Sequence, residues 1–231
     1  MSAPRVALVT GAGQGVGAGI ARALAEHGVA VVVNDLFPDR AEAVAAEVGG
    51  RAVAFDVTDL DAVRAGFATA GPVDILVNNA GIPADGFPQV DFKDSDPELW
   101  RRFVDLNLYG VLNCTHTVLP GMCDRGWGRV ITISSEAGRV GLPIRVALYG
   151  AAKAGALGLT KHLAHEVGRF GVTCNALTLG TMEGVPLDPS RVPIPRLGTG
   201  GDVGAMVAFL ASDAAEWITG QVIGVNGGAV T

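Results

Sequence analysis

A tyrosine and a lysine in the second half of the chain form the pair best suited to chemistry. Tyr149 and Lys153 lie four residues apart in an Ala- and Gly-rich segment predicted to be helical, so one turn brings both side chains to the same face. An ammonium group favours a nearby phenolate, so Lys153 is expected to lower the pKa of Tyr149 from its reference value of about 10. Such a tyrosine can exchange a proton with an alcohol or a ketone. The alternative is an accidental Tyr-x-x-x-Lys pair on a solvated helix face.

A serine upstream of this pair can act on the same substrate oxygen. Ser135 follows a predicted strand, Gly128–Ser134, at the carboxyl end of the strand, which is the edge where open α/β sheets bind ligands. Its hydroxyl can donate a hydrogen bond to the oxygen with which Tyr149 exchanges a proton. Ser134 is the competing candidate, although its place at the strand end suggests a structural hydrogen bond.

Short apolar runs alternate with helical stretches along the chain and predict the scaffold for these groups. The predicted strands are Val6–Thr10, Ala30–Asp35, Arg51–Asp56, Val73–Asn78, Gly128–Ser134, Val172–Thr178 and Gln221–Val225. The predicted helices begin near Gly15, span Arg40–Val48, Asp59–Ala70 and Asp202–Ala211, and include the Tyr149 helix and a long one opened by Ser95–Glu98. Strands without polar alternation suit a parallel sheet covered on both faces. We therefore expect one α/β domain over residues 1–231, with a Rossmann-like, doubly wound, seven-stranded parallel sheet flanked by helices on both faces.

A glycine-rich loop, Thr10–Gly17, joins the first strand to the first helix. Its glycines have the spacing Gly11-x-x-x-Gly15-x-Gly17, which permits a tight turn and close approach of backbone amides to a pyrophosphate at the helix N-terminus. We expect Gly11, Gln14, Gly15, Val16 and Gly17 to bind a dinucleotide, although such a loop alone can be an ordinary turn.

An acidic residue ends the second strand 18 residues after Gly17. The carboxylate of Asp35 can accept hydrogen bonds from both hydroxyls of an adenosine ribose and would repel a 2′-phosphate. We therefore expect NAD, with NADP disfavoured. Arg40 is the nearest cation and is expected to be a helix-surface charge, and Asp35 itself could be a turn residue.

Composition limits the other classes of function. The formal charge is −6 without a Lys/Arg cluster, which argues against nucleic acid and favours a small-molecule partner. No apolar run approaches the length of a membrane span, and no signal segment is evident. Three cysteines, Cys114, Cys123 and Cys174, fit reduced thiols in the cytoplasm. The four scattered histidines predict no metal site.

Five motifs together resemble the short-chain dehydrogenase/reductase family over essentially the whole chain. In order, they are the Thr10–Gly17 loop, Asp56-Val57, Asn78-Asn-Ala-Gly81, Asn107, and the set Ser135, Tyr149 and Lys153. The resemblance implies that Asp56 and Val57 flank the adenine, and that Asn78 to Gly81, with Ala80 among them, line the cofactor and brace the sheet. It also implies that Gly180 and Thr181 contact the cofactor, with Asn78 open to a purely structural function.

The resemblance implies an NAD-dependent oxidoreductase that interconverts a secondary alcohol and a ketone. Tyr149 is then the general acid/base, Ser135 fixes the oxygen, and Lys153 holds the nicotinamide ribose and supports Tyr149. Asn107 holds a water linked to Lys153. The alternatives are a 3-ketoacyl or hydroxyacyl thioester reductase or dehydrogenase, acting on CoA or carrier-protein substrates, and a non-catalytic dinucleotide-sensing protein. Relatives are commonly dimers or tetramers, so we expect a homo-oligomer.

Several features depart from the family pattern. The interval from Ser135 to Tyr149 is 14 residues, one more than in many relatives, and the loop at about 181–196 is short and proline-rich. Leu179-Gly180 replaces a usual Pro-Gly, and Asn226-Gly-Gly replaces a common Asp-Gly-Gly. Glu136, Arg139 and Arg145 are expected to be solvated loop charges, with contact to a polar substrate as the alternative. Pro120 is expected to kink or end the long helix that carries Asn107.

Overall fold

The structure is a computed structural model that describes residues 4–83, 90–185 and 188–231. The seven strands found there form one parallel sheet in the order β3-β2-β1-β4-β5-β6-β7. Their bounds are β1 (Val6–Val9), β2 (Ala30–Asp35), β3 (Arg51–Ala54), β4 (Ile75–Asn78), β5 (Gly128–Ser135), β6 (Val172–Leu179) and β7 (Val222–Val225). The strand order reverses between β1 and β4, which confirms the predicted doubly wound, Rossmann-like fold. In such sheets the ligand crevice lies at the carboxyl ends of the strands at this reversal.

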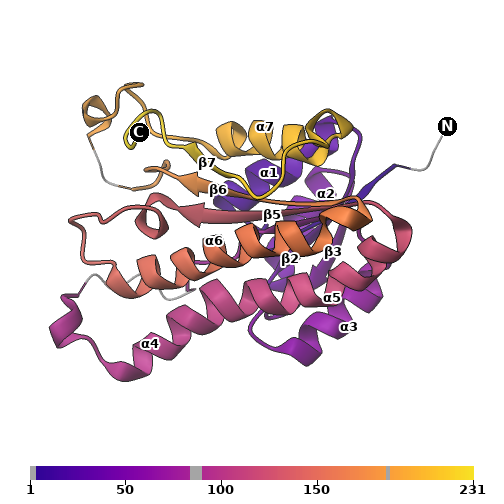
Figure 1. The fold of residues 1–231 in the computed structure, drawn as a ribbon, viewed down its shortest axis with the longest axis horizontal. Coiled ribbons are helices and arrows are strands. Elements are labelled where there is room, and N and C mark those ends of the chain that lie inside the picture. The colour runs from indigo at the N-terminus through magenta and orange to yellow at the C-terminus, as the bar shows by residue number, and fades with distance from the viewer. Residues whose placement is uncertain (1–3, 84–89, 186–187) are drawn as a thin grey trace.

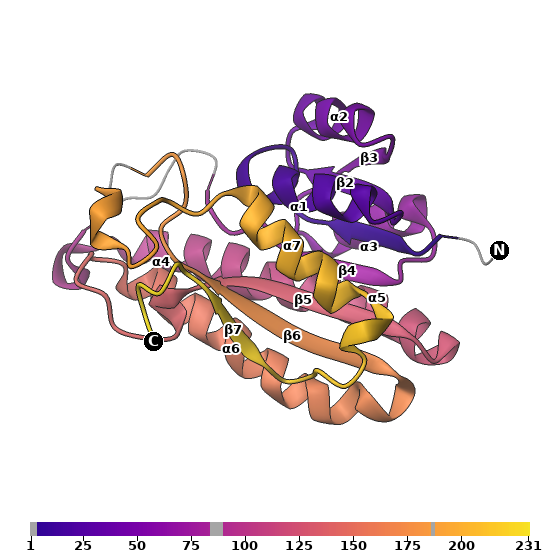
Figure 2. The ribbon, with the colours of Figure 1, turned by 90° about the horizontal axis from the view of Figure 1, so that it is seen from above.

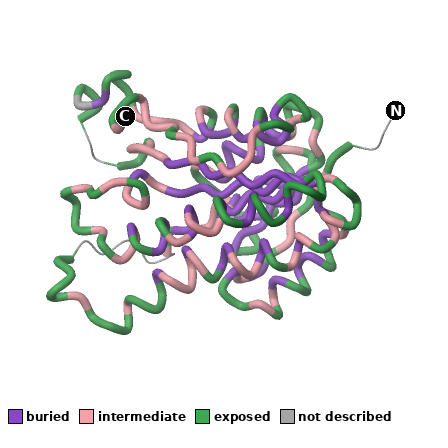
Figure 3. The backbone as a smooth tube through the Cα atoms, in the orientation of Figure 1, coloured by how far each residue is buried: buried purple, intermediate pink, exposed green. Residues whose placement is uncertain are grey.

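Helices cover both faces of the sheet, as predicted. They are α1 (Gly15–Glu26), α2 (Pro38–Glu47), α3 (Leu60–Ala70), α4 (Pro97–Val104), α5 (Gly110–Arg125), α6 (Ala147–Val167) and α7 (Gly200–Ala211). Figure 1 shows α1 and α7 on one side of the sheet and α5 and α6 on the other. The tube in Figure 3 shows that burial is concentrated along the strands between these two layers.

The strands pack alternately against the two helical layers. In β1, Ala7 and Val9 contact the cluster that includes α1 and α7, whereas Leu8 contacts the cluster that includes α3, α5 and α6. Leu8 is completely buried, and burial of such a side chain contributes about 1.5–3 kcal/mol to stability. Because both faces are apolar, the strands lack polar alternation, which is the pattern from which the parallel sheet was predicted.

The long helix differs from prediction. Its N-cap is Asp96, within the predicted Ser95–Glu98 start, and Asp96 Oδ1 accepts a hydrogen bond from Glu98 N at 3.0 Å. The chain continues helically through Pro120 to Arg125, so of the two expected outcomes, a kink or an end of the helix, the end at Pro120 is wrong. Regular α geometry is instead interrupted at η2, a π-helical segment over Asp105–Tyr109 that contains Asn107. Such π segments are frequent at functional sites.

Helices α1 and α7 approach each other unusually closely, and Figure 2 shows them side by side over one face of the sheet. A Cβ added to Gly19 would lie 2.5 Å from the Cα of Gly200, and one added to Gly204 would lie 2.9 Å from the carbonyl oxygen of Gly19. Only glycines permit this backbone contact, so the helix that follows the glycine-rich loop is packed directly on α7.

Candidate active site

A cleft of about 550 Å³ opens where the strand order reverses. Its walls include ten residues that the sequence predicted to bind the cofactor: Gly11, Gln14, Gly15, Val16, Gly17, Asp35, Asp56, Val57, Ala80 and Gly81. The volume is in the range of small-molecule and cofactor sites. The cleft therefore fits a dinucleotide in size and position.

The glycine-rich loop leaves no room for side chains on its inner side. Gly11 has a φ of 60°, and a Cβ there would lie 2.9 Å from the Cα of Ala80. A Cβ on Gly17 would lie 2.5 Å from the carbonyl oxygen of Gly11. The loop can thus turn tightly onto the start of α1, whose N-terminus favours a phosphate group.

Asn79, the second residue of the Asn78–Gly81 motif, holds the loop in this shape. Its Nδ2 donates to the carbonyl oxygens of Thr10 and Gly11 at 2.9 and 3.0 Å. Asn78 points elsewhere and donates from Nδ2 to Thr115 Oγ1 at 3.0 Å, while its side chain is buried. The geometry of Asn78 favours the structural alternative, whereas Asn79 contacts the glycine-rich loop directly.

Asp35 lines the cleft, and its carboxylate is held by two backbone amides. Its Oδ2 accepts a hydrogen bond from Gly13 N at 3.0 Å, and its Oδ1 accepts one from Phe37 N at 3.1 Å. Each carboxylate oxygen has a further lone pair for a ligand hydroxyl. Arg40 is exposed on α2, as expected from the sequence, and it also lines the cleft and lies over the Phe37 ring at 4.4 Å.

Two hydroxyls meet at the carboxyl end of β5. Ser135 lies close enough to Tyr149 for a side-chain hydrogen bond to lower the pKa of the tyrosine, and Ser135 Oγ accepts a hydrogen bond from Ala137 N at 3.2 Å. The competing Ser134 is buried, and its Oγ donates to the carbonyl oxygen of Lys153 at 3.4 Å. The geometry therefore favours Ser135 as the serine that faces the substrate.

Lys153 and Asn107 meet beside the cleft at Gly81. Lys153 is buried, and its Nζ donates to the carbonyl oxygen of Ile133 at 2.9 Å. The Oδ1 of Asn107 is buried without a hydrogen-bond partner among the described residues, while its Nδ2 donates to Phe103 O at 3.1 Å. A Cβ on Gly81 would lie 2.6 Å from Lys153 Nζ and 2.8 Å from Asn107 Oδ1. An acceptor with no partner next to an ammonium with remaining hydrogens fits the water link that the resemblance implies.

Burial sets the protonation behaviour of this cluster. It lowers the pKa of Lys153 to about 8. It also raises the pKa of Tyr149, and the hydrogen bond with Ser135 acts in the opposite direction without cancelling this effect. The predicted lowering of the tyrosine pKa by Lys153 is therefore wrong in direction, because Lys153 Nζ lies 5.7 Å from the centre of the Tyr149 ring and desolvation dominates.

A small hollow of about 20 Å³ adjoins Tyr149. Its lining includes the apolar side chains Val90, Phe92, Leu99, Phe103 and Val146. The volume is close to the minimum that one water molecule occupies, so the hollow has room for a methyl-sized group.

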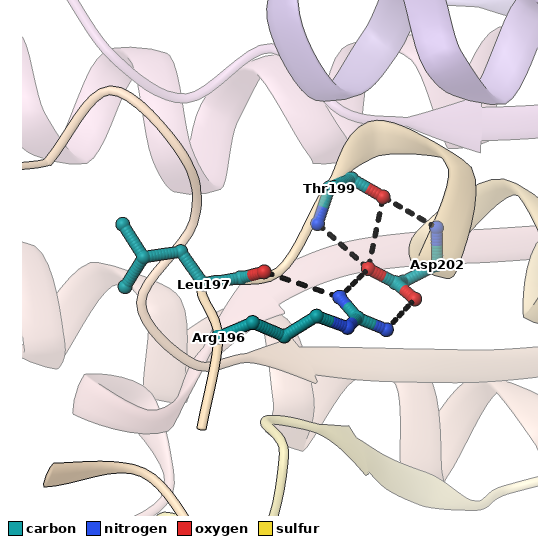
Figure 4. Close-up of polar contacts among 4 residues, drawn as sticks. All are labelled: Arg196, Leu197, Thr199 and Asp202. Carbon is teal, nitrogen blue, oxygen red and sulfur yellow. Dashed lines mark hydrogen bonds and ion pairs between the residues drawn. The ribbon is translucent and has the colours of Figure 1, made fainter. Parts of the chain in front are cut away.

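The short loop at about 181–196, of which residues 186–187 lie outside the described residues, is anchored at its end. Arg196 and Asp202 form a bidentate ion pair with N–O distances of 2.6 and 2.7 Å, and Arg196 also donates to the carbonyl oxygen of Leu197 at 3.1 Å (Figure 4). Asp202 and Thr199 form a capping box at the start of α7, and these bonds together hold the pKa of Asp202 well below its usual range. The loop therefore ends on a fixed helix terminus.

The two cofactor-contact predictions near this loop lie outside the wall of the main cleft. Gly180 N donates to Val225 O at 3.1 Å, and Thr181 lines a second hollow of about 520 Å³ beside α7 and β7. Both residues stay predictions as cofactor contacts.

Glu136 is not the solvated loop charge expected from the sequence. It is 2% exposed and lies directly after Ser135, where its Oε1 accepts hydrogen bonds from Thr178 and Asn226. Arg145 is exposed and pairs with Asp91 at 3.0 Å. It has a φ of 54°, so the longer Ser135–Tyr149 segment is locally strained at this residue.

Across the described ranges, no helix is both long and apolar enough to cross a membrane. Within the same ranges, no group of three or more His, Cys, Asp or Glu side chains is arranged to hold a metal ion.

Comparison with known proteins identifies the family. The sequence profile described as short chain dehydrogenase matches residues 5–191. The chain is 44% identical to an acetoacetyl-CoA reductase of Rhizobium meliloti (strain 1021), over 97% of this chain and 98% of that protein. It is 39% identical to a 3-oxoacyl-(acyl-carrier-protein) reductase of Staphylococcus aureus (strain N315), over 99% of each chain. The crystal structure of a 3-oxoacyl-(acyl-carrier protein) reductase with bound NAD from Brucella melitensis matches with a TM-score of 0.91 at 34% identity, over 98% of this chain and 92% of that one. The protein therefore belongs to the short-chain dehydrogenase family of oxidoreductases.

Proposed function

We propose that the protein is an NAD(H)-dependent oxidoreductase that interconverts a short 3-oxoacyl thioester and the corresponding 3-hydroxyacyl thioester. The observation that carries this proposal is the pair of Ser135 and Tyr149 together with buried Lys153, whose Nζ lies beside Gly81 in the wall of a dinucleotide-sized cleft. This substrate is one case of the secondary alcohol and ketone pair expected from the sequence, and it corresponds to the thioester alternative.

The residues of the cluster have separable functions in this proposal. A nicotinamide nucleotide bound in the cleft supplies or accepts the hydride at the carbinol carbon. Tyr149 gives a proton to the carbonyl oxygen during reduction and takes one from the hydroxyl during oxidation. Ser135 donates a hydrogen bond to the same oxygen and so stabilises the charge that develops on it. Lys153 would hold the nicotinamide ribose, and Asn107 Oδ1, which has no hydrogen-bond partner among the described residues, would hold a water through which Tyr149 regains its proton by way of Lys153.

The proposed preference for NAD over NADP rests on Asp35 in the lining of the cleft. Asp35 places a carboxylate where an adenosine ribose would lie, and a 2′-phosphate there would meet this negative charge. Arg40 in the same wall offsets part of that repulsion. Direct comparison of NADH with NADPH is therefore the measurement that decides this part of the proposal.

Two observations favour the thioester over a simple ketone. The relatives described above are reductases whose names specify acyl-CoA or acyl-carrier-protein substrates. The hollow beside Tyr149 has room for a methyl-sized group, which suits a short acyl chain such as acetoacetyl better than a long one.

The test is a substrate panel with both cofactors, run on the wild type and on Tyr149→Phe. We expect acetoacetyl-CoA to exceed free ketones in kcat/KM, NADH to exceed NADPH, and Tyr149→Phe to lose most turnover while NADH binding is retained. Full turnover in Tyr149→Phe would refute the assignment of the proton donor. NADH binding by the wild type without turnover of any panel member would instead favour the dinucleotide-sensing alternative.

Location and assembly follow as further proposals. Burial raises the pKa values of the Cys114 and Cys174 thiols to about 12, which keeps them protonated and unreactive and suits a cytoplasmic protein. We also propose a homo-oligomer, dimer or tetramer, built through α5 and α6. Light scattering of the purified protein tests the assembly.

A further inference from the structure

A buried carboxylate lies directly behind the serine of the proposed site. Glu136 Oε1 accepts hydrogen bonds from Thr178 Oγ1 and Asn226 Nδ2, both at 2.8 Å, and lies 3.6 Å from a guanidinium nitrogen of Arg139. Thr178 belongs to β6, and Asn226 follows β7. The carboxylate therefore ties together the carboxyl ends of β5, β6 and β7 immediately next to Ser135.

This tie holds a short turn that is packed tightly against the helix of Tyr149 and Lys153. The turn is η3 (Glu136–Gly138). A Cβ on Gly138 would lie 2.9 Å from the backbone of Lys153, and a Cβ on Gly150 of α6 would lie 2.6 Å from the carbonyl oxygen of Ala137. With no space left between η3 and α6, the position of η3 sets the distance between Ser135 and α6.

The same turn orients the serine hydroxyl. Ser135 Oγ accepts a hydrogen bond from Ala137 N at 3.2 Å, so one of its lone pairs is directed into η3. The hydroxyl hydrogen is then free to point toward Tyr149 and the substrate oxygen. A shift of η3 would turn this hydrogen away.

We propose that Glu136 is a positioning residue that fixes η3 between the ends of β6 and β7 and α6, and thereby fixes the Ser135 hydroxyl relative to Tyr149. This inference rests on the proposed function, because Ser135 and Tyr149 have to act on one substrate oxygen.

The amide of Asn226 is the matching partner of this carboxylate. Its Nδ2 donates to Glu136 Oε1 and to Val230 O, each at 2.8 Å, and its Oδ1 accepts from Gly228 N at 2.9 Å. An aspartate here would lose both donated bonds and would place one carboxylate against another. The Asn-Gly-Gly sequence, which departs from the common Asp-Gly-Gly, is thus explained by the presence of Glu136.

Burial of the Glu136 carboxylate lowers the stability of the fold, which argues that this residue has a function other than stabilising it. The second oxygen of Glu136, Oε2, is buried without a hydrogen-bond partner among the residues that the structure describes. Buried polar atoms without partners are rare, and proteins tolerate them mainly at functional sites.

The first test compares Glu136→Ala with Glu136→Gln. Alanine removes the tie, so we expect kcat to fall about 100-fold, as for a displacement of about 1 Å at the reacting groups, while the Kd for NADH stays unchanged. Glutamine keeps an oxygen that accepts from Thr178 and Asn226, so it should retain kcat within about tenfold. Val207→Ala, at a buried core position of α7, is the control that should lower the melting temperature without lowering kcat.

Double variants distinguish positioning from a general structural effect. In a Ser135→Ala background, Glu136→Ala should lower kcat little further, because the group that it positions is already gone. Asn226→Asp should lower kcat, and adding Glu136→Gln should restore part of it. Additive losses in the first pair, or wild-type kcat in Glu136→Ala, would overturn the inference.

A titration of the Tyr149 phenol tests the inference without a measurement of turnover. The chain has two tyrosines, so Tyr109→Phe leaves Tyr149 as the only phenol that ionises. In that background, Glu136→Ala should raise the pKa of Tyr149 as Ser135→Ala does, because both weaken the Ser135–Tyr149 hydrogen bond. An unchanged tyrosine titration in Glu136→Ala would refute the inference, whereas inactivity of the wild type on the whole substrate panel would refute only the proposed function.

Discussion

Replacing Gly81 with alanine is expected to disable the proposed site while leaving the fold intact. A Cβ at this position would lie 2.6 Å from Lys153 Nζ and 2.8 Å from Asn107 Oδ1, whereas ordinary contacts begin at 3.4 Å. The difference between 3.4 and 2.6 Å requires Lys153 Nζ to move by about 0.8 Å. Since the rest of the lysine is buried, this movement pulls Nζ away from the carbonyl oxygen of Ile133.

The two consequences of this displacement differ in kind. Loss of a hydrogen bond from a charged group lowers the free energy of unfolding by about 1.5–3 kcal/mol, which a domain of this size can tolerate. A displacement approaching 1 Å at a group that orients the cofactor and the proton donor lowers kcat by about 100-fold, equivalent to about 2.7 kcal/mol in the activation barrier. We therefore expect a folded protein with a large loss of turnover.

The assay combines kcat for acetoacetyl-CoA reduction with chemical denaturation, using Gly158→Ala as the matched control. Gly158 lies within α6, the helix of Lys153, and a Cβ there meets nothing within 4 Å. This control should gain about 0.5–1 kcal/mol in stability and keep its kcat. Wild-type kcat in Gly81→Ala would refute the reasoning, because it would show that Lys153 and Asn107 need not occupy these positions.

Two further predictions concern proton binding. Burial lowers the pKa of Lys153 to about 8 from 10.5, so the unfolded chain binds more protons than the fold between these values, and the group raises the free energy of unfolding by about 3 kcal/mol as pH rises from about 8 to 10.5. Lys153→Met should remove this rise from denaturation curves measured across that range, and an unchanged rise would contradict the assigned cause. Ser135→Ala removes the hydrogen bond that lowers the pKa of Tyr149, so the pH at which alcohol oxidation reaches half its plateau should increase. A decrease, or no change, would argue against the Ser135–Tyr149 contact.

The parts of the site that follow from local pattern were predictable from the sequence. The glycine spacing, the acidic residue at the end of β2 and the Tyr-x-x-x-Lys pair are each defined within one turn, strand or helix. The doubly wound sheet then brings their strand ends to one edge, and Asp35, Gly11 and Gly81 do line one cleft. The topology of the sheet brings these distant segments together, so no contact between individual residues had to be predicted.

Features that depend on distant partners could not be predicted in this way. The burial of Glu136 arises from hydrogen bonds to residues 42 and 90 positions away, Thr178 and Asn226. The sign of the pKa shift of Tyr149 depends on how many atoms surround the phenol, which spacing does not reveal. In α5 the proline at 120 is a local signal for a helix kink or end, yet the helix continues past it to Arg125, and a π-helical segment lies at Asp105–Tyr109.

The contact between Gly19 and Gly200 fixes α1 and α7 relative to each other, whereas the segment that precedes α7 is not part of this contact. Helix α1 starts at the dinucleotide loop, and α7 starts where the ion pair between Arg196 and Asp202 ends the short loop. Because the two helix backbones touch, both starting points belong to one rigid support. The segment between Thr181 and that ion pair can then be replaced by a longer or differently shaped segment from another protein, while the glycine-rich loop keeps its geometry. This segment is therefore a suitable place to engineer the substrate range.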